Sequence, residues 1–95
     1  MNEVKEILED RASDYGSFSN VAKITQDIVK ALENGASWKT REASFQVAFY
    51  MIANKMARAV NGALTRDTIL DIQGYAQLIL DNCDFKQEGR RKNES

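Results

Sequence analysis

Apolar residues recur every three to four positions along most of the chain, which is the period of amphipathic helices. One such segment runs from Asn2 to about Ala12, and Gly16 separates it from a second segment that ends at Asn34-Gly35. Proline is absent, and no run of alternating Val, Ile and Thr residues indicates a strand. The pattern predicts an all-α fold, a compact bundle of about four helices.

The third predicted helix, from about Arg41 to Val60, is apolar over most of its circumference. One stripe along it consists of Phe45, Phe49, Ile52, Met56 and Val60, and Val47 and Met51 lie well away from that stripe. A helix that is apolar nearly all round is usually central or lies at a subunit interface. We therefore expect this helix at the centre of the bundle, and the small size of the domain favours a homodimer.

Polar residues before each apolar segment indicate where the helices begin. Ser17 or Ser19 is expected to cap the second helix, and Ser37 or Thr40 the third. Thr65 is expected to cap the fourth helix, because its hydroxyl can accept a hydrogen bond from an amide of the first turn.

The length of 95 residues allows one domain and no second independent core. We place a single helical domain at residues 1–85 and a polar tail at residues 86–95. The stretch from Gln87 to Ser95 contains no apolar residue, so we expect the tail to be disordered.

Charge and hydropathy exclude several classes of protein. A net charge of −1 argues against a nucleic-acid-binding module, which usually carries a basic face. No apolar run reaches the length of about 18 residues that spans a membrane, and the charged amino terminus is unlike a signal peptide. We expect a cytoplasmic protein.

The absence of histidine restricts the chemistry that the chain can perform. Neither a His-containing zinc site nor a His-based triad can be built, and the single Cys83 cannot form an internal disulfide. Cys83 is expected to be a small core residue near a helix end. Any reaction would have to use carboxylates, Lys, Arg, Tyr or a bound metal.

Charged residues border the apolar stripes of the third and fourth predicted helices. Lys55 and Arg58 project on the side of Met51, where they could bind a ligand or bury only their stems and keep their charges in water. Asp67 and Asp71 lie one turn apart on the fourth helix.

Glycine within a helix costs about 1 kcal/mol relative to alanine, so Gly74 suggests close approach by another backbone or a ligand. An ordinary helix-to-helix contact would explain Gly74 equally well.

Three motifs together resemble a family of small phage-encoded helical proteins of unknown function. The motifs are Ile7-Leu-Glu-Asp-Arg11 followed by Tyr15-Gly16, Met51-Ile-Ala-Asn-Lys55-Met-Ala-Arg58 followed by Asn61-Gly62, and Asp67-x-x-x-Asp71-Ile-x-Gly74-Tyr75-Ala76. That family looks related to the nucleotide-modification-associated domains of phage genomes, so the resemblance implies the host cell cytoplasm and nucleotide metabolism.

Two positions depart from the family pattern. Ser17 stands where the family commonly has Asp after Tyr-Gly, which removes a possible metal ligand, and Thr68 replaces the commoner Ser. A looser similarity is to helical nucleotide pyrophosphatases of the MazG type, which hydrolyse nucleoside triphosphates with magnesium. This chain lacks their paired acidic signatures in the expected helices, so that similarity is an analogy at the level of the fold.

Two hypotheses follow. In the first, the protein binds a nucleotide or phosphorylated ligand with Mg²⁺ in the groove between the third and fourth helices. The residues in these roles would be Asp67 and Asp71 for the metal, Lys55 and Arg58 for phosphate, and Tyr15 or Tyr75 for the base or sugar.

In the second hypothesis, the protein is a non-enzymatic interaction module that binds a host or phage protein. The charged residues then only bridge the two helices, and outer apolar residues contact the partner: Phe18, Trp38, Val47 and Met51. Both hypotheses explain the same charged residues, and they leave open whether the protein is an enzyme.

Overall fold

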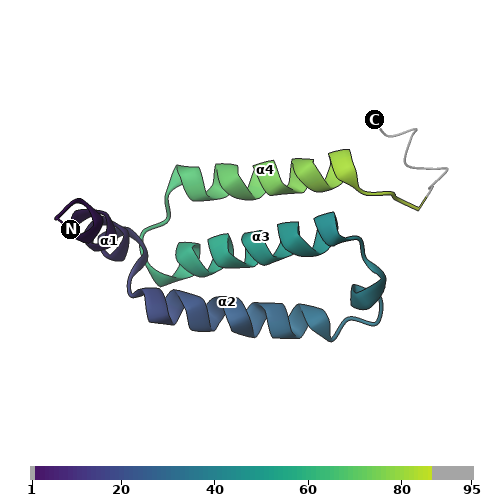
Figure 1. Ribbon diagram of the computed structural model, residues 1–95, viewed down its shortest axis with the longest axis horizontal. Helices are drawn as coiled ribbons and strands as arrows, with labels where there is room; N and C mark the ends of the chain where they lie inside the picture. Colours follow the sequence, from purple (N-terminus) through teal and green to yellow (C-terminus); the bar gives the residue numbers. More distant parts are fainter. Residues whose placement is uncertain (1, 87–95) are drawn as a thin grey trace.

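The computed structural model describes residues 2–86, and over these residues the chain forms α-helices joined by short connections (Figure 1). The elements are α1 (Asn2–Tyr15), α2 (Phe18–Glu33), the 3₁₀ helix η1 (Trp38–Thr40), α3 (Ala43–Asn61) and α4 (Arg66–Asn82). The all-α prediction with four helices is confirmed. Most of the predicted tail, residues 87–95, lies outside the described residues.

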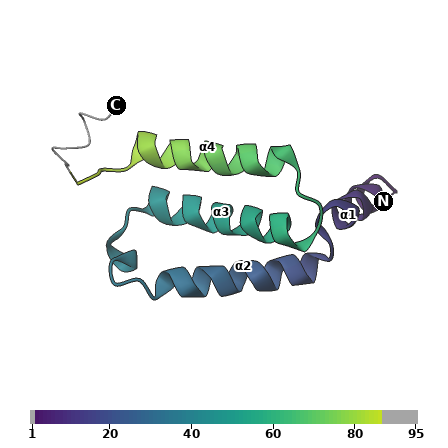
Figure 2. The same ribbon diagram turned by 180° about the vertical axis from the view of Figure 1, so that it is seen from behind.

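Helices α2, α3 and α4 run antiparallel, side by side, with α3 between the other two (Figures 1 and 2). The central position predicted for the third helix is confirmed, because α3 packs against both α2 and α4. Helix α1 lies at one end of this layer and is foreshortened in Figure 1, so it runs across the direction of the other three. Within residues 2–86, no helix has the length and apolar character needed to cross a membrane.

Two of the predicted caps are present. The Ser17 hydroxyl accepts a hydrogen bond from the Asn20 amide at 3.2 Å, and α2 begins there. The Thr65 hydroxyl accepts one from the Thr68 amide, also at 3.2 Å, and starts α4. Both hydroxyls satisfy an amide of the first helical turn that has no partner within its helix.

The predicted cap of the third helix is wrong. Helix α3 starts after Glu42, whose side chain makes no capping hydrogen bond. Ser37 and Thr40 belong to the η1 turn instead, where the Thr40 hydroxyl donates to the Ser37 carbonyl at 2.8 Å. The connection between α2 and α3 therefore has its own hydrogen-bonded turn, and α3 begins after both of the residues that were expected to cap it.

Small residues form the buried sides of the central helix. Ala48, Ala53 and Ala57 are the buried residues of α3. In contrast, Met56 and Val60 of the large apolar stripe are 46% and 74% exposed. Because α3 lies between two helices, alanines let both neighbours approach closely, and the large side chains project from the layer.

Trp38 is not an exposed partner-binding residue, contrary to the prediction. It is buried, and its ring lies 6.1 Å from the ring of Phe45 and 5.6 Å from that of Tyr50. The Gln46 amide also donates to the Trp38 carbonyl at 2.8 Å. These contacts fix the η1 turn on α3, so Trp38 closes the end of the layer opposite α1.

Candidate functional site

Two glycine motifs from distant parts of the sequence pack against each other where α1 meets α3. The Asn61 side-chain amide donates to the Tyr15 carbonyl at 2.8 Å, and the Ala63 amide donates to the Asp14 carbonyl at 2.6 Å. Gly16 has a φ of +79°, a conformation that side chains disfavour, and a Cβ there would collide with Asn61. We call this contact between Tyr15-Gly16 and Asn61-Gly62 the glycine clasp.

Gly62 is required in the clasp for a different reason. A Cβ on Gly62 would collide with the backbone of Asp14 and Tyr15, so this glycine permits close approach of two chain segments. The Asn20 side-chain amide donates to the side-chain oxygen of Asn61, which ties α2 to the same point. The clasp thus fixes the carboxyl end of α1 against the carboxyl end of α3.

The clasp places Tyr15 beside Arg58. The Arg58 guanidinium carbon lies 4.9 Å from the centre of the Tyr15 ring, within the range of a cation–π contact. Next to this pair is a cavity of about 470 Å³. Its lining residues come from α1, from the turn to α2, from the first turns of α2 and from α3: Leu8, Arg11, Ala12, Tyr15, Gly16, Phe18, Val21, Asn54 and Arg58.

This cavity, which we call the arginine cavity, combines positive charge with apolar walls. Arg11 and Arg58 supply its two charges, and no acidic residue lines it. Within residues 2–86 the ion pairs are Lys23 with Asp27 and Lys55 with Asp71, so neither arginine is paired there. A guanidinium presents a planar fork of donors that fits the oxygens of a phosphate or carboxylate. The cavity can therefore hold an anion beside an aromatic ring.

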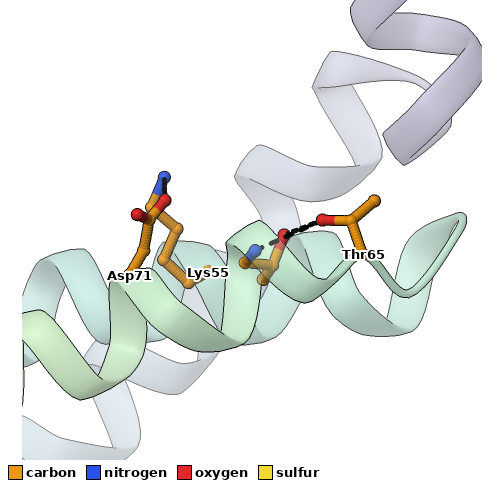
Figure 3. A network of polar contacts seen from close by, with 4 residues as sticks. Lys55, Thr65 and Asp71 are labelled. Atoms are coloured by element: carbon orange, nitrogen blue, oxygen red, sulfur yellow. Dashed lines mark hydrogen bonds and ion pairs between the residues drawn. The ribbon is translucent and has the colours of Figure 1, made fainter.

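Lys55 and Asp71 meet across the contact between α3 and α4 (Figure 3). The Lys55 ammonium lies 3.0 Å from the Asp71 carboxylate, and the two side chains are 15% and 49% exposed. At the start of α4, the hydroxyl of the capping residue Thr65 forms a hydrogen bond of 2.9 Å with the Thr68 hydroxyl (Figure 3). Lys55 therefore bridges two helices and lies apart from the arginine cavity.

The predicted metal ligands Asp67 and Asp71 lie one turn apart on α4. Asp67 is exposed in the first turn of α4, and Asp71 is engaged by Lys55. Among the residues that the structure describes, no three His, Cys, Asp or Glu side chains lie close enough to hold one metal ion. Mg²⁺ prefers about six oxygen ligands and is often held by one or two carboxylates together with water and substrate phosphates, so Asp67 and Asp71 would supply only part of its ligands.

Tyr75 and Gly74 lie elsewhere on α4. Tyr75 lines a second hollow, of about 410 Å³, with residues from the amino-terminal half of α3, so it does not share a cavity with Tyr15. A Cβ on Gly74 would meet nothing within 4 Å. The close approach predicted at Gly74 is therefore not found within the described chain.

Arg11 and Asn54 line the arginine cavity and were not among the predicted site residues. Arg11 precedes Tyr15 by four positions, so both lie on one face of α1. The spacing belongs to the motif of Arg11 followed by Tyr15-Gly16, and this motif could have identified Arg11 as a site residue. Asn54 lies one turn before Arg58 on α3, and its amide donates to the Thr25 hydroxyl at 3.4 Å.

Cys83 lies away from the arginine cavity, at the carboxyl end of α4, and is partly buried. Burial raises the pKa of its thiol, and the negative charges of Glu42 and Asp84 raise this pKa further. The Glu42 carboxylate accepts a hydrogen bond from the Asp84 backbone amide at 2.7 Å, and this bond holds the carboxylate near the thiol. Cys83 is therefore a weak nucleophile at neutral pH.

Comparison with known families identifies this chain at the level of a family. The model of DUF6378, a domain of unknown function, matches residues 1–82, and the chain belongs to that family. No curated protein and no solved structure shows significant similarity to it.

Proposed function

We propose that this member of the DUF6378 family binds a small anionic ligand that carries an aromatic ring, a nucleotide or a similar phosphorylated compound, in the arginine cavity. The observation that carries the proposal is the placement of Arg11 and Arg58, neither in an ion pair within residues 2–86, around Tyr15 in one cavity of about 470 Å³. Cavities that bind small molecules typically measure about 300 to 1,000 Å³.

The contacts within the cavity suit the two halves of such a ligand. The guanidinium groups of Arg11 and Arg58 can bind phosphate oxygens through paired hydrogen bonds. Arg58 already lies over the Tyr15 ring, which restricts the orientation of its planar group before a ligand enters. Leu8, Phe18 and Val21 provide apolar surface for a base or sugar.

The resemblance to phage-encoded proteins and to nucleotide-modification-associated domains supports a nucleotide as the ligand and a phage as the source of the protein. The ligand's phosphate then contacts Arg11 and Arg58, while Lys55 contributes to the contact between α3 and α4. Binding of Mg²⁺ at Asp67 and Asp71 is a separate prediction, and the proposal needs no metal-dependent step.

Thermal unfolding with a panel of nucleoside triphosphates, nucleoside monophosphates, nucleosides and inorganic phosphate tests the proposal. EDTA in all samples removes divalent cations. A nucleotide present at about one hundred times its dissociation constant should stabilise the protein by about 2.7 kcal/mol. Release of pyrophosphate or phosphate, measured in parallel with Mg²⁺ added, decides between a binding protein and an enzyme.

Matched variants locate the site. Arg58→Gln removes one guanidinium from the cavity and should weaken nucleotide binding at least tenfold. Arg66→Gln makes the same change of charge at an exposed position outside the cavity and should leave binding unchanged. The proposal is contradicted if no phosphorylated compound stabilises the wild type, or if both variants bind as the wild type does.

A second candidate function, a non-enzymatic module that binds a host or phage protein, is favoured by one specific observation. Phe18 is 83% exposed at the rim of the arginine cavity, and Val47 is 55% exposed on α3. Exposed aromatic side chains beside arginines are frequent in protein interfaces. Binding of an acidic protein that Arg58→Gln abolishes, without any response to nucleotides, would favour this function.

A further inference from the structure

The layer of α2, α3 and α4 has two faces that differ in charge. Arg58 and the Lys55 and Asp71 pair lie on one face, together with the arginine cavity. A rotation of about 80 to 140° from Lys55 around α3 leads to the other face. This second face, which we call the uncharged face, carries six large apolar residues on α3 and α4: Phe45, Phe49, Met56, Val60, Ile69 and Ile72.

The uncharged face has apolar surface that nothing within residues 2–86 covers. Met56, Val60 and Ile69 are 46%, 74% and 43% exposed, and the stacked rings of Phe45 and Phe49, 4.2 Å apart, are only partly buried. Stable domains usually pack two layers of secondary structure around a core. Here one layer of three helices is present, and no large side chain of the described residues is completely buried.

We propose that the uncharged face binds a second copy of the chain in a symmetric dimer. The size of the face fits this partner. The 19 residues of α3 extend about 28 Å, and three helices spaced about 9 Å apart give a face of about 800 Å², of which α3 and α4 supply about two thirds. A standard protein interface buries about 800 Å² on each partner.

The chemistry of the face also selects a second copy. The α3 and α4 portions of the face carry no charged residue, and the charge beside them is Arg41, whose guanidinium carbon lies 5.8 Å from the centre of the Phe45 ring. Most of the face therefore offers little to attract an acidic or basic partner. A flat apolar surface is matched by another flat apolar surface, and a two-fold axis places Met56, Val60 and Ile69 against the same face of the second copy. The dimer then has two layers of helices with an apolar core between them.

The dimer leaves the arginine cavity accessible, because that cavity opens on the opposite face. Dimerisation and ligand binding can therefore fail independently. A dimer that does not respond to nucleotides would contradict only the proposed function, and a monomer that binds them would contradict only the dimer.

Two methionines of α3 provide a matched test. Met56→Glu places a charge on the uncharged face, whereas Met51→Glu places the same charge on the opposite face, where Met51 is 36% exposed. Light scattering over a wide range of concentration should give twice the 10.7 kDa chain mass for the wild type and for Met51→Glu. Met56→Glu should give the single-chain mass.

A second substitution guards against a variant that fails to fold. Val60 is 74% exposed, so Val60→Glu should keep the helical circular dichroism of the wild type and yet give monomers. A monomeric wild type would overturn the proposal and leave the face for a different protein. A dimer that persists in both Met56→Glu and Val60→Glu would overturn it as well, and dissociation by Met51→Glu alone would place the interface on the opposite face.

Discussion

The ion pair between Lys55 and Asp71 allows a quantitative prediction. Asp71→Asn keeps the size of the side chain and removes its charge, which leaves the Lys55 ammonium, on a side chain only 15% exposed, without its partner at 3.0 Å. Removing one partner from a fully buried pair costs about 3 to 5 kcal/mol, and an exposed pair contributes about 0 to 1 kcal/mol. Because the Asp71 side chain is 49% exposed, water screens the pair, and we expect a loss of about 1 to 2 kcal/mol.

Urea unfolding of the wild type and the variant measures this loss, and the chain offers a matched control. Lys23 and Asp27 form an ion pair at 3.1 Å on α2, with side chains 72% and 59% exposed. Asp27→Asn should therefore change the free energy of unfolding by less than about 0.5 kcal/mol. We therefore expect Asp71→Asn to be clearly the more destabilising change, and equal losses in the two variants would contradict this expectation.

Addition of Mg²⁺ separates this structural role from a metal site. If Asp67 and Asp71 repel each other while they wait for a cation, Asp71→Asn should stabilise the protein without metal. The wild type should then gain stability from Mg²⁺, and the variant should not. That pair of results would refute our account of Asp71 as the partner of Lys55.

Two further predictions concern glycine and cysteine. Gly74→Ala should stabilise the protein by about 1 kcal/mol, or about 4 to 8 °C in melting temperature, because α4 has room for a Cβ there. Gly16→Ala should instead destabilise the protein, because φ is +79° at this position. A lower melting temperature of Gly74→Ala would show that another backbone or a ligand approaches this position. Cys83 should react with iodoacetamide more slowly than a free thiol at neutral pH, and Glu42→Gln should accelerate the reaction, because removing the negative charge lowers the raised pKa of the thiol. A rate for the wild type equal to that of free cysteine would contradict this.

The parts of the fold that could be predicted depend mostly on residues close to one another in the sequence. The caps at Ser17 and Thr65 depend on hydrogen bonds to amides three residues away, so the sequence displays both partners together. The central position of α3 followed from its apolar circumference. The cap of α3 could not be found in this way, because Thr40 bonds within the η1 turn and not to the helix.

The buried sides of α3 were not visible in the sequence pattern. Periodicity draws attention to large residues, such as Met56, yet Ala53 and Ala57 are the ones that contact neighbouring helices closely. Small residues are buried here because α3 lies between two helices, and this arrangement depends on the packing of the whole layer.

The candidate site was only partly predictable for a similar reason. The prediction placed Arg58 and Tyr15 or Tyr75 in the groove between the third and fourth helices, whereas Tyr15 and Arg58 lie together where α1 meets α3. The spacing of Lys55 and Asp71 along their helices was consistent with the contact that the structure shows. Arg11 was missed as a site residue because its position depends on where α1 lies. That position is set by the glycine clasp, whose partners are separated by 46 residues in the sequence.

The glycine clasp also has a consequence for the order in which the chain folds. Helices α2 and α3 form a hairpin of consecutive elements, so they can pair before α1 is in place. When α2 and α3 pair, the end of α3 lies next to the start of α2, so Asn61 is already close to Tyr15. The pairing therefore removes most of the entropic cost of closing the 46-residue loop between these two residues. Helix α1 then docks last and should detach first, so its amide protons should exchange with solvent faster than those of α3. Because α1 supplies Arg11 and Tyr15, each such detachment would take the arginine cavity apart while the rest of the protein stays folded.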